Sequence, residues 1–150
     1  MSYEDLYQEI LLDHYRNPRN RCNGEMTGFC VKHENPLCGD ELSLALEVDE
    51  QDRIVNVCFQ GHGCSISQAS ASLMTEAVRG LTRAEAEELV EKVRLMLRGE
   101  KDGSALGDIQ ALEGVSRFPV RIKCALLAWM ALKDALNSVH LAAGAAHEHN

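Results

Sequence analysis

The sequence predicts a single α+β domain, in which helices pack on a small antiparallel sheet of about three strands. Three observations predict it. The chain has 150 residues, the usual size of one domain. Segments in which apolar residues recur at every second position, as in strands, lie in the first part of the chain, after one helical segment. Segments with helical periodicity then follow as a block, which is typical of α+β folds and not of alternating α/β folds.

Apolar residues recur at every second position, the period of a strand, in residues 42–48 and in residues 54–59. Between them, residues 49–52 are Asp-Glu-Gln-Asp, a short polar connection. This combination predicts an antiparallel hairpin. A shorter alternation over residues 29–33 predicts a third strand.

Three helices are predicted before the last third of the chain. The first covers residues 3–16, ends at Asn-Pro, and has an apolar face made of Leu6, Ile10, Leu11 and Tyr15. The second follows Gly-His-Gly at residues 61–63 and stops at Gly80. The third covers residues 82–99 and begins with Thr-Arg-Ala-Glu, the pattern of a capping box.

The last third carries the most apolar helix, over residues 120–137, and a short helical turn is predicted around residues 112–115. Residues 140–150 are small, polar and aperiodic, so we expect a flexible tail there. No internal repeat is visible. The predicted domain therefore covers residues 1–139, and the tail covers residues 140–150.

The charge of the chain excludes two classes of partner. It has 15 Lys and Arg against 23 Asp and Glu, a net charge of −8 with histidine neutral. Binding to nucleic acid or to an anionic membrane needs clustered basic residues, so we expect neither partner. The start of the chain lacks the pattern of a signal peptide, and no stretch approaches the ~18 apolar residues of a membrane span. We therefore expect a cytoplasmic protein.

Cysteine is the residue type that needs an explanation. The chain has six cysteines, at positions 22, 30, 38, 58, 64 and 124. In a cytoplasmic chain of this size we expect reduced thiols and not disulfides. Cys22 and Cys30 are interpreted as loop or half-buried thiols, and Cys58 as a small packing residue in a strand.

The other three cysteines lie where predicted elements begin or end. Cys38 stands two residues before Asp40 at the start of a strand, with a glycine between them that lets the turn bend. Cys64 lies at the mouth of a helix, where the backbone N–H groups and the dipole favour a thiolate. Cys124 lies one turn into the last helix, close to Arg121 and Lys123. All three cysteines can meet at one tip of the domain.

Spacing alone does not establish a metal site. The chain has no Cys-x-x-Cys pair, and the intervals between the three cysteines match no local zinc-binding signature. Burial as small apolar residues would explain each cysteine singly. On the residues alone, burial explains any one of these cysteines better than metal binding does.

Four blocks of the chain resemble one known family. They are residues 6–18, residues 35–40 (Asn-Pro-Leu-Cys-Gly-Asp), residues 61–67 (Gly-His-Gly-Cys-Ser-Ile-Ser) and residues 121–129 (Arg-Ile-Lys-Cys-Ala-Leu-Leu-Ala-Trp). In this order they are similar to the signature blocks of the IscU/NifU-type iron–sulfur cluster assembly proteins. The resemblance covers nearly the whole chain and implies the small α+β domain of that family.

Two features resemble the SufU branch of this family. Lys123 precedes the last cysteine, where IscU scaffolds have histidine, and the helix over residues 82–99 is similar to an insertion of that branch. The resemblance implies a zinc-dependent sulfurtransferase, which works with a cysteine desulfurase of the SufS type and with other iron–sulfur assembly components.

The same resemblance implies a set of site residues. The zinc ligands would be Cys38, Asp40, Cys64 and Cys124, with Cys38 as the acceptor of persulfide sulfur. Three thiolates and a carboxylate outweigh the charge of one zinc ion, so nearby cations are expected to offset the excess. Arg121 and Lys123 are the candidates for that supporting role.

Three alternatives stay open. A scaffold would assemble an iron–sulfur cluster on Cys38, Cys64 and Cys124. A purely structural zinc module would lose its fold on chelation without affecting any desulfurase. A thiol redox protein would cycle a disulfide, a function that the absence of Cys-x-x-Cys disfavours.

Overall fold

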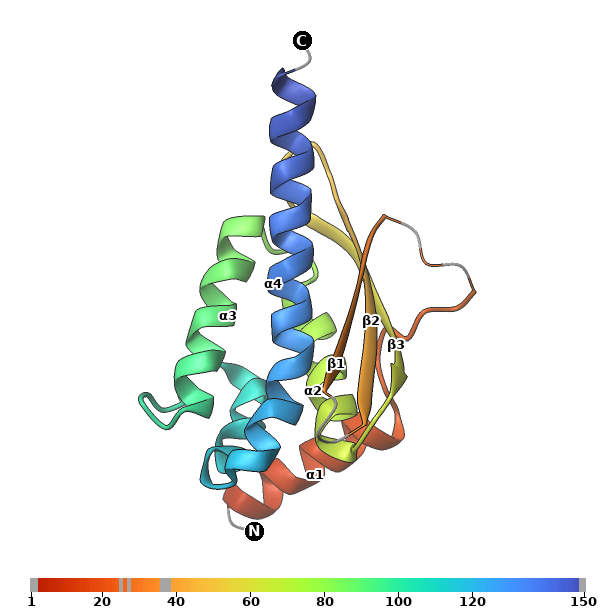
Figure 1. The fold of residues 1–150 in the computed structure, drawn as a ribbon. Coiled ribbons are helices and arrows are strands. Elements are labelled where there is room, and N and C mark those ends of the chain that lie inside the picture. The colour runs from red at the N-terminus through yellow and green to blue at the C-terminus, as the bar shows by residue number, and fades with distance from the viewer. Residues whose placement is uncertain (1–2, 25, 27, 36–38, 149–150) are drawn as a thin grey trace.

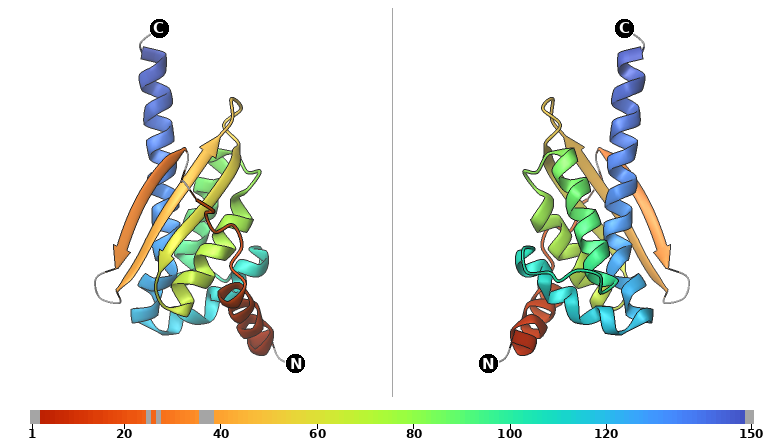
Figure 2. Two further views of the ribbon diagram at one scale, coloured as in Figure 1. Left: turned by 90° about the vertical axis from the view of Figure 1, so that its right-hand side faces the viewer. Right: turned by 90° about the vertical axis from the view of Figure 1, so that its left-hand side faces the viewer.

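The computed structural model describes residues 3–24, 26, 28–35 and 39–148 of the chain. It shows an α+β domain in which helices cover one face of a three-stranded antiparallel sheet (Figures 1 and 2), as predicted. The strands are β1 (Phe29–Asn35), β2 (Asp40–Val48) and β3 (Ile54–His62), in the order β1-β2-β3. The helices are α1 (Tyr3–Arg16), α2 (Ser65–Val78), α3 (Arg83–Leu97), the 3-10 helix η1 (Gly107–Arg117) and α4 (Pro119–Glu148).

The sheet has the predicted hairpin, but the inward face of β3 differs from the simple alternation. Val55 is 49% exposed, whereas Ile54 and Val57 are buried. The register between β2 and β3 shifts at Glu47/Val48, so one extra residue enters β3. Such a bulge turns the following side chains to the other face of the sheet. The alternation therefore predicted the strand correctly and the orientation of its first residues wrongly.

A polar contact inside the core holds α2 against α4. The Trp129 indole N–H donates to Ser70 Oγ at 3.0 Å, and the Ser70 hydroxyl donates to the Ala125 carbonyl at 2.6 Å. All three residues are fully buried. Because small side chains line this part of α2, the two helices approach closely, and the indole N–H is still satisfied. Trp129 is thus a core residue.

The remaining helices follow local sequence signals. Thr82 and Glu85 form the predicted capping box at the start of α3, with reciprocal side chain to backbone hydrogen bonds. The turn expected around residues 112–115 belongs to the longer η1. α4 does not end near residue 139 but continues to Glu148 and extends past the rest of the domain (Figure 1). The flexibility of residues 140–150 stays a prediction.

Helix α1 has the predicted bounds, and Ile10 and Leu11 of its predicted apolar face pack against the core, but the other two residues of that face do not. Leu6 and Tyr15 are 43% and 45% exposed, whereas His14 is 5% exposed. His14 Nδ1 lies 2.7 Å from the hydroxyl oxygen of Ser72 on α2, and the backbone N–H of Arg19 also donates to that oxygen. A polar contact therefore decides which side of α1 is buried, which a search for apolar periodicity cannot find.

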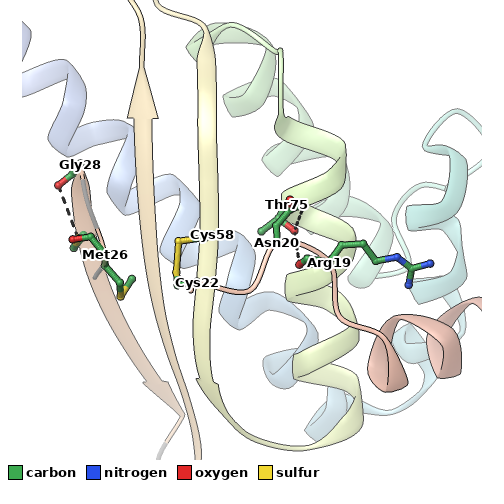
Figure 3. The surroundings of a disulfide bond; sticks show 8 residues. Arg19, Asn20, Cys22, Met26, Gly28, Cys58 and Thr75 are labelled. Carbon is green, nitrogen blue, oxygen red and sulfur yellow. Dashed lines mark hydrogen bonds between the residues drawn. A yellow bond between two sulfur atoms is a disulfide. The ribbon is translucent and has the colours of Figure 1, made fainter. Parts of the chain in front are cut away.

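The expectation of reduced thiols is wrong for two of the six cysteines. Cys22, in the segment after α1, forms a disulfide with Cys58 on β3 (Figure 3). The segment returns along the free edge of β3, where Arg21 pairs with Phe59 as an isolated parallel bridge. Sequence spacing gave no sign of this return. Cys30, by contrast, is a free and exposed thiol on β1.

No helix in the described part of the chain is long and apolar enough to cross a membrane.

His14 makes the stability of the fold depend on pH. Burial lowers the pKa of His14 from its ordinary value of 6.5, and the Arg19 guanidinium acts in the same direction. A base with a lowered pKa binds its proton more weakly in the folded than in the unfolded chain. Its stabilising contribution is therefore complete above about pH 6.5 and is lost as the pH falls below that value.

We expect the midpoint of thermal unfolding to fall less between about pH 7.5 and about pH 5.5 in His14→Gln than in the wild type. Calorimetry at several pH values measures the difference. His62→Gln is the matched control, since His62 is 74% exposed, and it should keep the wild-type slope. Equal slopes in the wild type and in His14→Gln would contradict this role of His14.

Candidate metal centre

Asp40 is placed by the turn that joins β1 to β2. It is the first residue of β2 and pairs with Asn35, the last residue of β1. Gly39, just before it, has φ 71°, a left-handed conformation that suits glycine. The Gly39 N–H donates to the Asn35 carbonyl at 2.9 Å, which closes the turn. The carboxylate of Asp40 is thereby held in the interior, with 2% of the residue exposed.

Cys64 is placed where the sheet passes into the first core helix. β3 ends at His62 and α2 begins at Ser65, so Cys64 is the residue that precedes the helix. Its backbone N–H donates to Asp40 Oδ1 at 2.8 Å. Its carbonyl accepts from the Ser67 hydroxyl at 3.0 Å. The carboxylate therefore lies at a helix N-terminus, where free N–H groups and the helix dipole stabilise a negative charge.

Cys124 completes the cluster from the far end of the chain. It lies in the second turn of α4 and is fully buried, and its Sγ lies 3.8 Å from the Val120 carbonyl oxygen. One carboxylate oxygen of Asp40 and the Sγ atoms of Cys64 and Cys124 lie within 4.8 Å of one another. We call these three residues the metal centre. The predicted juxtaposition of Asp40, Cys64 and Cys124 is thus present.

The donors of the metal centre suit a zinc ion. In tetrahedral zinc sites the Zn–S and Zn–O distances place two donors about 3.5–3.8 Å apart. Asp40 Oδ2 and Cys64 Sγ are 3.8 Å apart. Structural and catalytic zinc sites use thiolate and carboxylate donors of this kind, and three protein donors leave room for a fourth ligand. The fourth predicted ligand, Cys38, lies outside the described residues.

Gly63 leaves the space that the carboxylate occupies. A Cβ atom at this position would overlap Asp40 Oδ1 and would lie 2.5 Å from Ser67 Oγ. Any larger residue would therefore push Asp40 away from Cys64. The glycine before the cysteine in the Gly-His-Gly-Cys block is thus required by the packing of the metal centre, which sequence reasoning did not state.

The predicted supporting cations lie at the start of α4, close in sequence to Cys124. Arg121 and Lys123 are both exposed. Within the described part of the chain, neither side chain forms an ion pair. Their role in offsetting the charge of the centre stays a prediction.

A different ion pair lies at the metal end of the sheet. Lys32 Nζ lies 2.6 Å from a Glu41 carboxylate oxygen. This contact lowers the pKa of Glu41 and raises the pKa of Lys32. The exposed His62 lies 3.6 Å from the same carboxylate. His62 is therefore directed at Glu41.

A groove of about 810 Å³ opens beside the metal centre. Ser65 and Arg121 line it, each within one turn of a cysteine of the centre. Leu11 of α1 and Phe118, the residue before α4, supply part of its apolar wall. Phe118 is 60% exposed and nearby Val120 is 69% exposed. Sequence reasoning missed this groove because its walls come from four elements that are distant in the sequence.

Comparison with known proteins assigns a family to this geometry. Residues 6–139 match the model of the NifU-like N terminal domain. The chain belongs to that family. The match begins within α1 and ends within α4, and it includes every residue of the metal centre. Two of the relatives below are named as iron–sulfur cluster assembly scaffold proteins, and one is named as a zinc-dependent sulfurtransferase.

Two curated relatives are similar over almost their full length. The zinc-dependent sulfurtransferase SufU of Bacillus subtilis is 44% identical over 133 residues, which cover 87% of this chain and 88% of the relative. The iron–sulfur cluster assembly scaffold protein IscU of Streptococcus pyogenes is 41% identical over 143 residues, which cover 91% and 88%. The NifU-like family thus includes relatives of both kinds at nearly equal identity.

Solved structures support the same fold. A putative iron–sulfur cluster assembly scaffold protein for the SUF system from Fervidobacterium islandicum superposes with a TM-score of 0.80 at 36% identity, over 90% of this chain and 99% of that one. The N-terminal part of a NifU-like protein from Brucella abortus has the same TM-score at 21% identity, over 91% and 96%. The second likeness concerns the fold alone.

Gly63→Ala tests the packing of the metal centre. The added methyl group would displace the Asp40 carboxylate, so we expect metal affinity to fall by about 10-fold to 100-fold, the usual effect of disturbing the surroundings of a ligand. Competition with a chromophoric chelator measures that affinity. Gly114→Ala is the matched control, since a Cβ atom there meets nothing within 4 Å. Equal affinities in the two variants would show that Gly63 does not shape the centre.

Proposed function

We propose that this protein is a zinc-dependent sulfurtransferase, which accepts persulfide sulfur from a cysteine desulfurase of the SufS type and passes it to iron–sulfur cluster assembly. The observation that carries the proposal is the cluster of one carboxylate and two thiols at the ends of three separate elements. The identity of 44% to a protein named as a zinc-dependent sulfurtransferase supports it.

The donor set supports zinc as the resident metal. A carboxylate oxygen beside thiolates is a common zinc environment, whereas most iron–sulfur clusters are held by cysteine thiolates alone. When bound, zinc keeps its cysteine ligands as thiolates and protects them from oxidation. In this chain the Cys64 N–H orients Asp40, and α2 places its N-terminus against the same carboxylate. Both contacts hold the carboxylate beside the Cys64 thiol, as a shared metal ion requires.

Cys38 is proposed as the fourth ligand and as the sulfur acceptor. It stands two residues before Asp40, so chain geometry limits the separation of the two Cα atoms to about 7 Å. In the transfer step, the Cys38 thiolate attacks the outer sulfur of the desulfurase persulfide. The sulfur–sulfur bond of that persulfide breaks, its cysteine leaves as a thiolate, and Cys38 gains one sulfur atom.

The proposed partner docks over the groove beside the metal centre. Transfer requires direct contact between two cysteines, so the desulfurase must cover the tip that carries Cys64 and Cys124. The groove lies at this tip, and its apolar wall together with the exposed Phe118 offers contact area where the sulfur must arrive. Arg121 lines the same groove, so a cation stands near the path of the incoming negatively charged sulfur. Lys123 is proposed to act with it.

A scaffold function is the second candidate, because an iron–sulfur cluster scaffold is 41% identical to this chain. It would assemble a cluster on Cys38, Cys64 and Cys124. The two candidates differ in the resident metal and in the fate of the sulfur. Stoichiometric iron and sulfide with visible absorbance would favour the scaffold, and stoichiometric zinc would favour the transferase.

Mass spectrometry of the transfer reaction tests the proposal. After incubation with a SufS-type desulfurase and cysteine, we expect the wild type to gain the mass of one sulfur atom, with the addition mapped to Cys38. Cys38→Ser should show no gain, and Cys30→Ser, which changes an exposed free thiol, should react like the wild type. We also expect Asp40→Ala to lose zinc and to stimulate the desulfurase less.

Two results would contradict the proposal. An unchanged yield in Cys38→Ser would remove Cys38 as the acceptor. If the wild type contains zinc but does not stimulate the desulfurase, the metal centre is supported and the transferase function is rejected.

A further inference from the structure

The Cys22–Cys58 disulfide lies on the side of the sheet opposite to the core helices. Val57 and Phe59 point into the core, and Cys58 between them points to the outer face (Figure 3). The next residues on that face, Gln60 and His62, are exposed. Both cysteines of the disulfide are half-buried and not enclosed. A dithiol in solution therefore has a path to the sulfur atoms.

This disulfide is separate from the metal centre. Cys58 lies four positions before the end of β3 at His62, about 13 Å along the extended strand. Cys58 and Cys22 are therefore outside the set of donors that includes Cys64. Their chemistry needs an explanation of its own, which the proposed function does not supply.

The disulfide fastens a segment that connects two elements of the domain. On one side, the Asn20 carbonyl accepts from the Phe59 N–H at 3.1 Å, and the Cys22 N–H donates to the Phe59 carbonyl at 2.9 Å. On the other side, the Arg19 N–H donates to Ser72 Oγ at 2.8 Å. The segment thus joins β3 to α2, and these are the two elements between which Cys64 lies.

Side-chain contacts strengthen the same connection. The Asn20 amide donates to Thr75 Oγ1 at 3.2 Å (Figure 3), and Arg79 donates to Asn20 Oδ1 at 2.8 Å. Arg21 places its guanidinium 5.6 Å from the centre of the Phe59 ring and donates to the Gly61 carbonyl. Most of these contacts are at the surface, so water can replace them once the covalent link opens.

We propose that Cys22 and Cys58 form a thiol–disulfide exchange site, which takes dithiols and their disulfides as substrates and sets how firmly residues 19–22 hold β3 to α2. A dithiol thiolate attacks one sulfur of the pair and forms a mixed disulfide, and the other cysteine leaves as a thiolate. The second thiol of the reductant then displaces the first cysteine. Two electrons pass from the dithiol to the protein, and the two protons of the dithiol end on Cys22 and Cys58.

Whether the Cys22–Cys58 pair is oxidised or reduced also affects the end of α1, through this segment. Residues 17–22 follow α1 directly, and His14 in the last turn of α1 shares Ser72 with the Arg19 N–H. Opening the disulfide frees the end of the segment that is not anchored on α2. We therefore expect the last turn of α1 to become more mobile in the reduced protein.

The first test titrates the metal-loaded protein with mixtures of reduced and oxidised dithiothreitol. Acid quenching, alkylation and peptide mass spectrometry count the free thiols. We expect Cys22 and Cys58 to become alkylated together, in one reversible two-electron step, while the metal content stays constant. Cys30→Ser should titrate like the wild type, since Cys30 is a free thiol outside the pair.

Two outcomes of the titration would overturn the proposal. In one, oxidised dithiothreitol or oxidised glutathione fails to form the Cys22–Cys58 bond in the folded protein. In the other, the bond opens only when the protein is unfolded, as for a static structural disulfide. Neither outcome affects persulfide transfer to Cys38, which is measured separately.

The second test measures amide hydrogen exchange of the oxidised and the reduced wild type. We expect amide exchange at residues 19–22 to become about tenfold faster or more on reduction. The disulfide restricts local opening of this segment away from β3, and reduction removes that restriction. The amides of α3 should not change. Cys22→Ser and Cys58→Ser should each reproduce the reduced state without a reductant. Unchanged protection at residues 19–22 would overturn the proposal.

Discussion

The hydrogen bond from the Cys64 N–H to the Asp40 carboxylate is the contact on which the site depends. It joins the first residue of β2 to the residue that precedes α2, and so it brings an oxygen donor beside a thiol. A buried carboxylate is costly unless its charge is compensated, and here the helix N-terminus provides that compensation. Gly63 allows the close approach, because a side chain at that position would occupy the place of the carboxylate. The core then supplies the third donor: Trp129 and Ser70 hold α4 against α2, and Cys124 lies on α4 five residues before Trp129.

Local signals in the sequence were sufficient for most of the fold. The capping box at Thr82 and the alternation over residues 42–48 each depend on neighbours in the chain, so each was predicted. The failures depend on contacts between distant segments. The burial of His14 is decided by Ser72, and the Cys22–Cys58 disulfide is decided by the return of a loop to the edge of β3. The orientation of Val55 follows from a bulge that only the pairing of β2 with β3 reveals.

The site shows the same division. The three donors of the metal centre could be selected from the sequence because each follows a recognisable turn or helix start, and because the blocks around them resemble one family. The distances between these donors could not be predicted from the sequence, since Cys64 and Cys124 are 60 positions apart in the chain. The groove beside the centre was missed for the same reason. The choice between a sulfur carrier and a scaffold rests on the bound metal, because the same thiolates can hold zinc or iron.

X-ray absorption at the metal edge of the purified protein tests the central claim most directly. The account predicts one zinc ion per chain, with three sulfur neighbours at about 2.3 Å and one oxygen neighbour at about 2.0–2.2 Å. These would be the thiolates of Cys38, Cys64 and Cys124 and the carboxylate of Asp40. Iron with bridging sulfide, or zinc surrounded by nitrogen and oxygen alone, would contradict the account.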